Sequence, residues 1–188
     1  MEPELRAALL KMYLERLRSL GDDHAAAIRL DVAPATLRRI EGAPMSGWLP
    51  LALEVEILEA VERRCGEDGV RELGRVLGRV AVDSLVFRPL VAATFAMLGR
   101  LPETLLRLVL QGWETATRHA GRPSYRRVGP QLAHAVLDDL PAVCRNRAHL
   151  LRTCGAIEGL FATAGRTAAV ELVWEPNSER AVFAISWR

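Results

Sequence analysis

The C-terminal residues 166–188 place the strongest constraint on what this chain can fold into. Every second residue of two segments is apolar, which gives one face with Ala168, Val170, Leu172 and Trp174 and another with Ala181, Phe183, Ile185 and Trp187. A period of two is typical of half-buried strands, and the segment 175–179 between them is rich in turn-forming residues. The sequence therefore predicts a C-terminal β-hairpin whose apolar face other elements must cover.

The chain before residue 120 has helical periodicity. We predict helices over 2–20, 22–30, 34–40, 50–64, 67–84, 89–98, 102–119 and, nearer the end, 146–164. The helix at 102–119 is apolar nearly all round, which predicts a central, buried position. Segments 125–128 and 132–137 are predicted as strands with weak alternation, and helix is an open alternative for them. The predicted fold is α+β, with a mostly helical N-terminal two-thirds packed on a small antiparallel sheet that the C-terminal β-hairpin completes.

The length of 188 residues suits one domain. We expect residues 1–47 to form a helical N-terminal extension and residues 48–188 to form an α+β core of a ligand-binding type. Gly74 and Gly78 lie four residues apart in one predicted helix, as Gly155 and Gly159 do in another. Glycine is costly inside a helix, so the first pair predicts close approach of a neighbouring backbone.

Charge and motifs exclude several classes of function. The net charge of +2 is too small to indicate a nucleic-acid or anionic-lipid surface. The chain has three cysteines and no C-x-x-C pair, so we expect neither a disulfide framework nor a structural metal site. The sequence lacks the usual nucleophile, phosphate-loop, dinucleotide and zinc-protease motifs, so we expect no enzyme and no catalytic residues. The N-terminus does not resemble a signal peptide and no run suits a membrane span, so we expect a cytoplasmic protein.

The order of several weak motifs carries a resemblance. Leu73-Gly74-Arg75 and Leu77-Gly78-Arg79 are followed by Leu101-Pro102, Trp113, Leu140-Pro141, the glycines of the 146–164 helix and Ser186-Trp187. This order resembles an uncharacterised family of similar length that is abundant as paralogues in myxobacteria. More distantly, the ending is similar to the superfamily of four-vinyl-reductase-type domains, heme–nitric-oxide-binding domains and vesicle-tethering subunits of the TRAPP type.

The distant resemblance implies helices packed on an antiparallel sheet around a lipophilic cavity that holds heme, an acyl chain or another apolar molecule in different relatives. This chain has Ser124-Tyr125-Arg126-Arg127 in place of the Tyr-x-Ser-x-Arg signature of the heme branch, so we expect no cofactor. The histidines that heme ligation would need are limited to His24, His119, His134 and His149.

The predicted site is an apolar pocket between the 102–119 helix, the glycine-bearing helix and the sheet. Its predicted lining residues are Leu105, Val109, Trp113, Cys154, Ile157 and Phe161. Each of them is also compatible with plain core packing. Pockets of this kind have few polar anchors, so the function we expect is non-catalytic: binding of a small lipophilic molecule, or signalling through an outer surface.

Two alternatives remain open from the sequence. Residues 22–41 resemble a helix-turn-helix whose second helix would expose Thr36, Arg38 and Arg39 to DNA, although Asp31 stands where the turn glycine is usual. The chain is not basic enough for the electrostatic term that dominates DNA affinity. The third hypothesis is a protein-interaction scaffold that self-associates through an exposed strand at the sheet edge or the apolar face of the 2–20 helix. A homodimer or another protein partner would follow from it.

Overall fold

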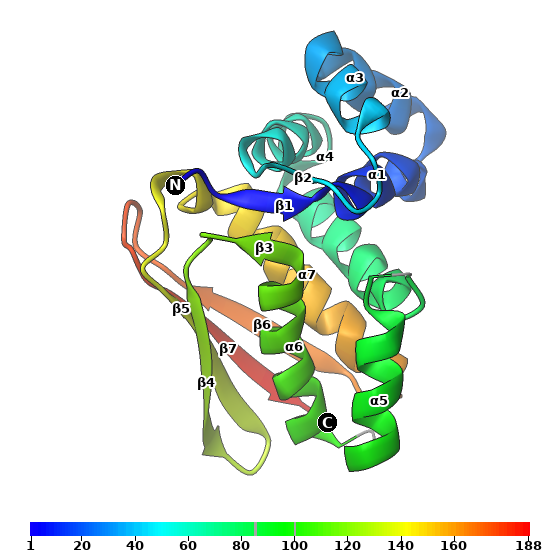
Figure 1. Ribbon diagram of the computed structural model, residues 1–188. Helices are drawn as coiled ribbons and strands as arrows, with labels where there is room; N and C mark the ends of the chain where they lie inside the picture. Colours follow the sequence, from blue (N-terminus) through cyan, green and yellow to red (C-terminus); the bar gives the residue numbers. More distant parts are fainter. Residues whose placement is uncertain (85, 100) are drawn as a thin grey trace.

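The computed structural model describes residues 1–84, 86–99 and 101–188. The fold is α+β, as the sequence predicts. Helices α1 to α3 lie at one end of the molecule and α4 leads from them, while α6 and α7 run alongside a four-stranded antiparallel sheet and α5 lies next to α6 (Figure 1). The N-terminal elements are β1 (Glu4–Arg6), α1 (Ala7–Arg16), the 3-10 helix η1 (Leu17–Leu20), α2 (Asp22–Asp31), α3 (Pro34–Gly42) and β2 (Trp48–Pro50).

The predicted single helix over 2–20 is wrong at its N-terminal end, and its last turn, Leu17–Leu20, is a 3-10 helix that ends at Gly21 as predicted. Residues Glu4–Arg6 form a strand that pairs with β2, with Leu5 opposite Leu49, and also with β3 (Thr117–Arg118). The first backbone N–H groups of a helix have no partner within the helix. Pairing with two distant strands gives the backbone of this segment hydrogen-bond partners, and this overrides the local preference for helix. The apolar face of this segment packs into the core, with Leu9, Tyr13 and Leu17 buried. It is therefore not available for the self-association that the scaffold hypothesis placed there.

The two helices predicted at 50–64 and 67–84 form one element, α4 (Ala52–Ala81), with a break at Gly66. Gly66 has φ 68° and ψ −175°, a conformation that favours glycine, which confirms the stop predicted there. After it come α5 (Arg88–Leu98) and α6 (Pro102–Ala116).

Helix α6 is amphipathic and not apolar all round. Its outer face carries the exposed residues Arg107, Gln111 and Glu114, which recur at four- and three-residue spacing. The opposite face is buried and includes Leu105 and Leu106. The predicted central position is therefore wrong: α6 covers the sheet from outside, and it ends at Ala116 because Thr117 joins β3.

The main sheet has the order β4-β5-β7-β6, with every pair antiparallel. Its strands are β4 (Arg122–Gly129), β5 (Leu132–Asp138), β6 (Ala168–Val173) and β7 (Ala181–Trp187). In the β6–β7 hairpin Val170 lies opposite Ile185 and Leu172 opposite Phe183, which confirms the predicted alternation. The weak segments at 125–128 and 132–137 are strands, which leaves β4 and β6 as the edges of this sheet.

Helix α7 (Arg147–Thr163), which follows the 3-10 helix η2 (Ala142–Cys144), packs against both α4 and β6. Glycines mediate its contact with α4: a Cβ on Gly155 would lie 2.0 Å from the carbonyl oxygen of Arg71, and a Cβ on Gly74 would lie 2.2 Å from that of Arg152. The reciprocal contacts confirm that the Gly74/Gly78 pair admits a neighbouring backbone. They also show that the glycine face of α7 meets α4.

One buried carboxylate ties this helix pair to the sheet. Glu158 of α7 pairs with Arg71 and Arg75 of α4 and accepts a hydrogen bond of 3.1 Å from the backbone N–H of Val170 in β6. Burial alone would raise the pKa of Glu158, but the hydrogen bonds from Arg71, Val170 and Arg75 hold it below the usual value.

Candidate functional site

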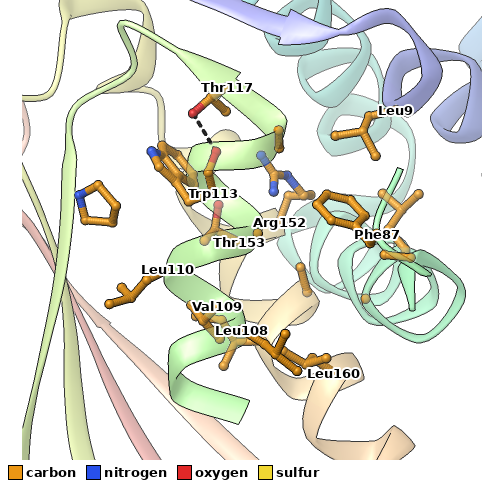
Figure 2. Close-up of a pocket in the computed structure, with 18 of the residues that line it drawn as sticks. Leu9, Phe87, Leu108, Val109, Leu110, Trp113, Thr117, Arg152, Thr153 and Leu160 are labelled. Atoms are coloured by element: carbon orange, nitrogen blue, oxygen red, sulfur yellow. Dashed lines mark hydrogen bonds between the residues drawn. The ribbon is translucent and has the colours of Figure 1, made fainter. Parts of the chain in front are cut away.

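An apolar cavity of about 170 Å³ lies between α6, α7, the sheet and the N-terminal elements. Figure 2 shows Val109 and Trp113 of α6, Thr153 and Leu160 of α7, and Phe87 among the residues that surround it. An engineered cavity of about 150 Å³ lined by similar side chains stays dry and binds benzene. The cavity of this protein therefore has room for a ring-sized apolar molecule.

Small residues from several elements lie around this cavity. Gly78 of α4, Gly112 of α6, Ala135 of β5 and Ala156 of α7 all line the cavity. A Cβ on Gly112 would meet only one atom within 4 Å, the Cε1 of Phe87 at 4.0 Å. A larger side chain at Gly112 would have room to extend into this space. A Cβ on Gly78 would instead lie 2.1 Å from the carbonyl oxygen of Ala156, so Gly78 serves the contact between α4 and α7.

A buried polar cluster adjoins the cavity. Glu54 of α4, fully buried, forms an ion pair of 2.6 Å with Arg152 and accepts a hydrogen bond from the Tyr13 hydroxyl. The Nδ1 atom of His149 lies 3.1 Å from the other Glu54 oxygen and 3.3 Å from an Arg152 nitrogen. A carboxylate only accepts, so we assign the proton of the His149 ring to Nδ1.

The charges within this cluster balance. Burial alone would raise the pKa of Glu54, but the positive charge of Arg152 and the contacts with His149 and Tyr13 lower it to about 2. Burial raises the pKa of the Tyr13 phenol well above its usual value, so the hydroxyl stays neutral. Burial would lower the pKa of Arg152, but the negative charge of Glu54 outweighs that effect and the net shift is upward. Glu54 and Arg152 are thus a charged pair without excess charge.

Two side chains that line the cavity each have a buried N–H without a partner among the described residues. The Nε1 atom of Trp113 and the Nε atom of Arg152 are buried and find no acceptor among the described residues, although both side chains line the cavity. The indole of Trp113 also packs edge-on against the His149 ring, with 5.6 Å between ring centroids. The Nε2 atom of His149 is likewise buried and unpaired in the described part of the chain, but His149 is not among the cavity's lining residues.

Three of the six predicted pocket residues line the cavity and three do not. Val109, Trp113 and Ile157 are on its wall. Leu105, Cys154 and Phe161 are fully buried in the surrounding core and do not line this cavity.

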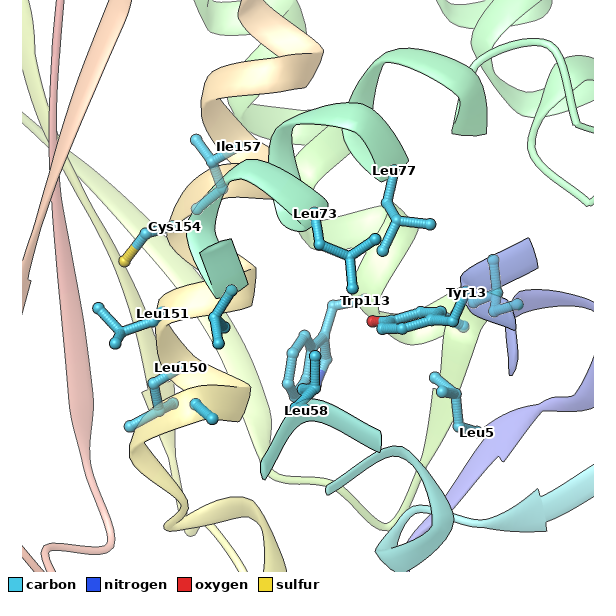
Figure 3. Packing of buried hydrophobic residues seen from close by; sticks show 14 of the residues in the cluster. Leu5, Tyr13, Leu58, Leu73, Leu77, Trp113, Leu150, Leu151, Cys154 and Ile157 are labelled. Atoms are coloured by element: carbon cyan, nitrogen blue, oxygen red, sulfur yellow. The ribbon is translucent and has the colours of Figure 1, made fainter. Parts of the chain in front are cut away.

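The side chains of Cys154 and Phe161 point away from the cavity. The sulfur of Cys154 points toward the sheet, away from Trp113 and Tyr13 (Figure 3), and the Phe161 ring packs on Trp187 at 5.9 Å between centroids. Burial raises the pKa of the Cys154 thiol to about 12, so it stays protonated. Helix α7 contacts α4, α6 and β6, and its Phe161 also meets Trp187 of β7. One apolar stripe in the sequence cannot say which of these elements each residue meets.

Sequence reasoning missed Arg152, Tyr13 and Phe87 as wall residues. The charged Arg152, which stands in the largely apolar run Leu150–Phe161, was the available signal, because a buried arginine requires a partner. That partner, Glu54, comes from a distant helix that only the tertiary structure brings close.

The residues proposed for DNA contact are not presented together. Arg38 and Arg39 of α3 are exposed, but Thr36 is buried and its hydroxyl donates a hydrogen bond of 2.6 Å to Glu56 of α4. The prediction of an exposed Thr36 is wrong, because α3 turns its first turn toward α4.

The described residues contain neither a metal-binding cluster nor a bilayer-crossing helix. Within 1–84, 86–99 and 101–188, His, Cys, Asp and Glu side chains form no group of three suited to a metal ion. Over the same ranges, none of the helices has the length and apolarity of a membrane span.

Comparisons with known proteins identify the fold. No family model matches the sequence, and no curated protein matches it. An Fe(II) unliganded H-NOX protein from K. algicida is similar in structure, with a TM-score of 0.62, 12% identity and coverage of 98% of this chain and 97% of that chain. A mutant H-NOX from T. tengcongensis has a TM-score of 0.58, 17% identity and coverage of 98% of both chains.

A trafficking protein particle complex subunit 3 from Naegleria fowleri, covalently bound to palmitic acid, is also similar. Its TM-score is 0.53 at 11% identity, over 73% of this chain and 93% of that chain. At these identities the likenesses show the fold alone. They confirm the distant resemblance to the heme–nitric-oxide-binding and TRAPP-type branches.

Proposed function

We propose that this chain is a non-catalytic binding domain that takes a small lipophilic molecule into the cavity beside Trp113. The observation that carries the proposal is an apolar pocket of about 170 Å³ between α6, α7 and the sheet. A folded core normally closes such space, because each void forfeits packing contacts. Retaining it has a stability cost that ligand binding can offset.

The structural neighbours support a ligand-binding role. One of them is an H-NOX protein with Fe(II), another is a structure that probes heme distortion in the H-NOX family, and a third is covalently bound to palmitic acid. The ordered motifs from Leu73 to Trp187 support membership of the myxobacterial paralogous family, and we propose a cytoplasmic sensing or signalling role in a bacterium.

Heme does not fit the residues of this cavity. None of the four histidines is among the residues that line it in the described part of the chain. Tyr13 lines it, but its hydroxyl donates to Glu54 and burial raises its pKa, so the phenolate that heme iron would need is disfavoured. No cysteine among the described lining residues offers a thiolate. We therefore base the proposal on a metal-free apolar ligand.

Helix α5 is the wall best suited to respond to a ligand. Within α5 only Val91 is buried among the described residues, while Leu90 and Val91, with Phe87 just before the helix, line the cavity. An element with few buried contacts opens at low free-energy cost. Filling the cavity would add contacts to α5, so occupancy would change the stability and the outer surface of this helix.

Benzene binding tests the proposal directly. Wild-type protein should bind benzene and gain thermal stability from it, because a ligand that binds only the folded state stabilises that state. Gly112→Leu should abolish this gain by filling the space, whereas Gln111→Leu adds the same side chain on the exposed face of α6 and should preserve it. Absence of any benzene effect on the wild-type protein would reject the proposal.

Mass spectrometry provides a second test. Protein purified from a bacterial host and then denatured should release a non-covalent apolar molecule. Gly112→Leu protein from the same host should release less of it, with Gln111→Leu as the control. Equal release from both variants would place the molecule elsewhere on the protein.

A further inference from the structure

The main sheet has an outer face, on the side opposite its core residues. Val170 of β6 and Ile185 of β7 are buried in the core, whereas the alternate residues of β6, Ala169, Glu171 and Val173, are exposed. Successive side chains of a strand point to opposite faces, so these exposed residues point away from the core. Val173 has 56% of its surface exposed. The outer face is therefore open to solvent at β6 in the described part of the chain.

Strand pairing arranges the outer face in rows that cross all four strands. One row consists of Ser124, Val136, Val182 and Val173, and the next row consists of Arg126, His134, Ala184 and Glu171. Facing side chains in such a row lie about 5 Å apart. The middle of the face is therefore built mainly from valine and alanine, while Arg126 stands at the β4 edge and Glu171 at the β6 edge.

The two edge charges are opposite in sign and unpaired. Neither Arg126 nor Glu171 forms an ion pair with a described residue, and the Arg126 guanidinium lies 3.5 Å from Nδ1 of His134. Three strand spacings of about 4.8 Å, or roughly 14 Å, separate the two edges, which is too far for a direct pair within one chain. A partner that covers this face would have to offer the opposite charge at each edge.

The edges of the sheet are poorly suited to pairing with another strand. The backbone N–H of Val170, at the centre of β6, donates to Glu158 at 3.1 Å, and the Val170 carbonyl accepts a hydrogen bond from Arg71. At the other edge, Pro123 of β4 has no N–H to donate. Strand addition needs free backbone groups along an edge, so the outer face is the better surface for self-association.

We propose that the outer face of the main sheet is the interface of a homodimer, in which two copies stack face to face about a twofold axis parallel to the strands. This rotation places β4 of one copy over β6 of the other, so Arg126 meets Glu171 of the partner subunit, and the symmetry forms this ion pair twice. The valines of the neighbouring row are buried between the two sheets, as in aligned sheet packing.

The charge pattern selects this axis over the alternative. A twofold axis across the strands would place β4 over β4 and bring the two Arg126 side chains of the dimer together, as well as the two Glu171 side chains. Like charges that face each other are destabilising. A second copy turned about the parallel axis therefore supplies the opposite charge at both edges.

The size of the face indicates a reversible dimer. Four strands about 4.8 Å apart, with about six residues of about 3.3 Å each, cover a flat area of roughly 400 Å². A standard interface buries about 800 Å² of accessible surface on each partner. We therefore expect a dissociation constant in the micromolar range, which sedimentation velocity over a concentration series can measure.

Charge reversal tests the interface. Glu171→Arg and Arg126→Glu each replace two attractive contacts by two repulsive ones, so each should weaken the dimer by roughly 5- to 100-fold. The double variant restores opposite charges and should restore the dimer, and an equimolar mixture of the two single variants should form a heterodimer. Glu114→Arg and Arg107→Glu make the same changes of charge on the exposed face of α6 and should leave the dissociation constant unchanged.

Other results would overturn the inference. A wild-type protein that stays monomeric at high concentration would reject the dimer, and a dimer that both single variants leave intact would place the interface elsewhere. A double variant that remains weak while the mixture of single variants associates would reject the parallel axis in favour of β4 over β4. Circular dichroism of each variant checks that its fold is unchanged, and none of these outcomes depends on a ligand in the cavity.

Discussion

Replacing Gly155 with alanine should separate α7 from α4. The added Cβ would lie 2.0 Å from the carbonyl oxygen of Arg71 and 2.9 Å from the nitrogen of Arg75, both backbone atoms. A carbon and a carbonyl oxygen rarely approach closer than about 3.3 Å, so the helices would have to move apart by roughly 1 Å.

The matched variant Gly112→Ala isolates this effect. Both glycines lie inside helices without a positive φ, so both substitutions gain about 1 kcal/mol of helix propensity. Gly112→Ala meets nothing closer than 4.0 Å and should raise the free energy of unfolding by that amount. Overpacking typically costs about 1 to 3 kcal/mol or more, so Gly155→Ala should be less stable than Gly112→Ala by at least that difference.

Urea denaturation followed by circular dichroism measures both variants on one scale. The m-value should stay constant, so that the shift in midpoint reports stability alone. Gly155→Ala with the stability of Gly112→Ala would refute the close backbone approach and with it the packing of the helix pair. A destabilised Gly112→Ala would refute the open space beside Phe87.

Three further predictions concern the ion pairs. The pKa of Glu54 lies near 2 in the folded protein against 4.5 for the free side chain, so the pair contributes about 3 kcal/mol above pH 4.5, and this contribution is lost as pH falls toward 2. Glu54→Gln should cost roughly 3 to 5 kcal/mol at neutral pH, because it leaves Arg152 buried without its counter-charge, and it should flatten the acid limb of the stability curve. Glu158→Gln should cost roughly 1 to 3 kcal/mol, since the partly buried Arg71 and Arg75 both lose a charged acceptor. Arg64→Ala should change stability little, because its pair with Asp31 lies at the surface.

Acid and urea titrations of the same variants check these expectations. An acid limb in Glu54→Gln identical to that of the wild type would show that another group controls acid unfolding. A Glu158→Gln variant as stable as the wild type would show that Glu158 does not link α4, α7 and β6. A large loss of stability in Arg64→Ala would contradict the assignment of that pair to the surface.

Hydrophobic periodicity and the glycines that end helices determined much of the fold. The C-terminal hairpin, the stop at Gly66 and the helix carrying Gly155 follow from local periodicity and backbone preference, which act over a few residues. A pocket bounded by α6, α7 and the sheet could also be anticipated, with Val109, Trp113 and Ile157 on its wall.

Only the tertiary structure decided the rest. Glu4–Arg6 is a strand because β2 and β3 lie beside it. Thr36 is buried where its hydroxyl meets Glu56 of α4, and Cys154 faces the sheet because α7 is covered on several sides. The pairing of Glu54 with Arg152 joins residues almost a hundred positions apart. Sequence periodicity reports that a side chain is buried. Which neighbour it meets, and whether space remains between them, depends on how distant elements pack.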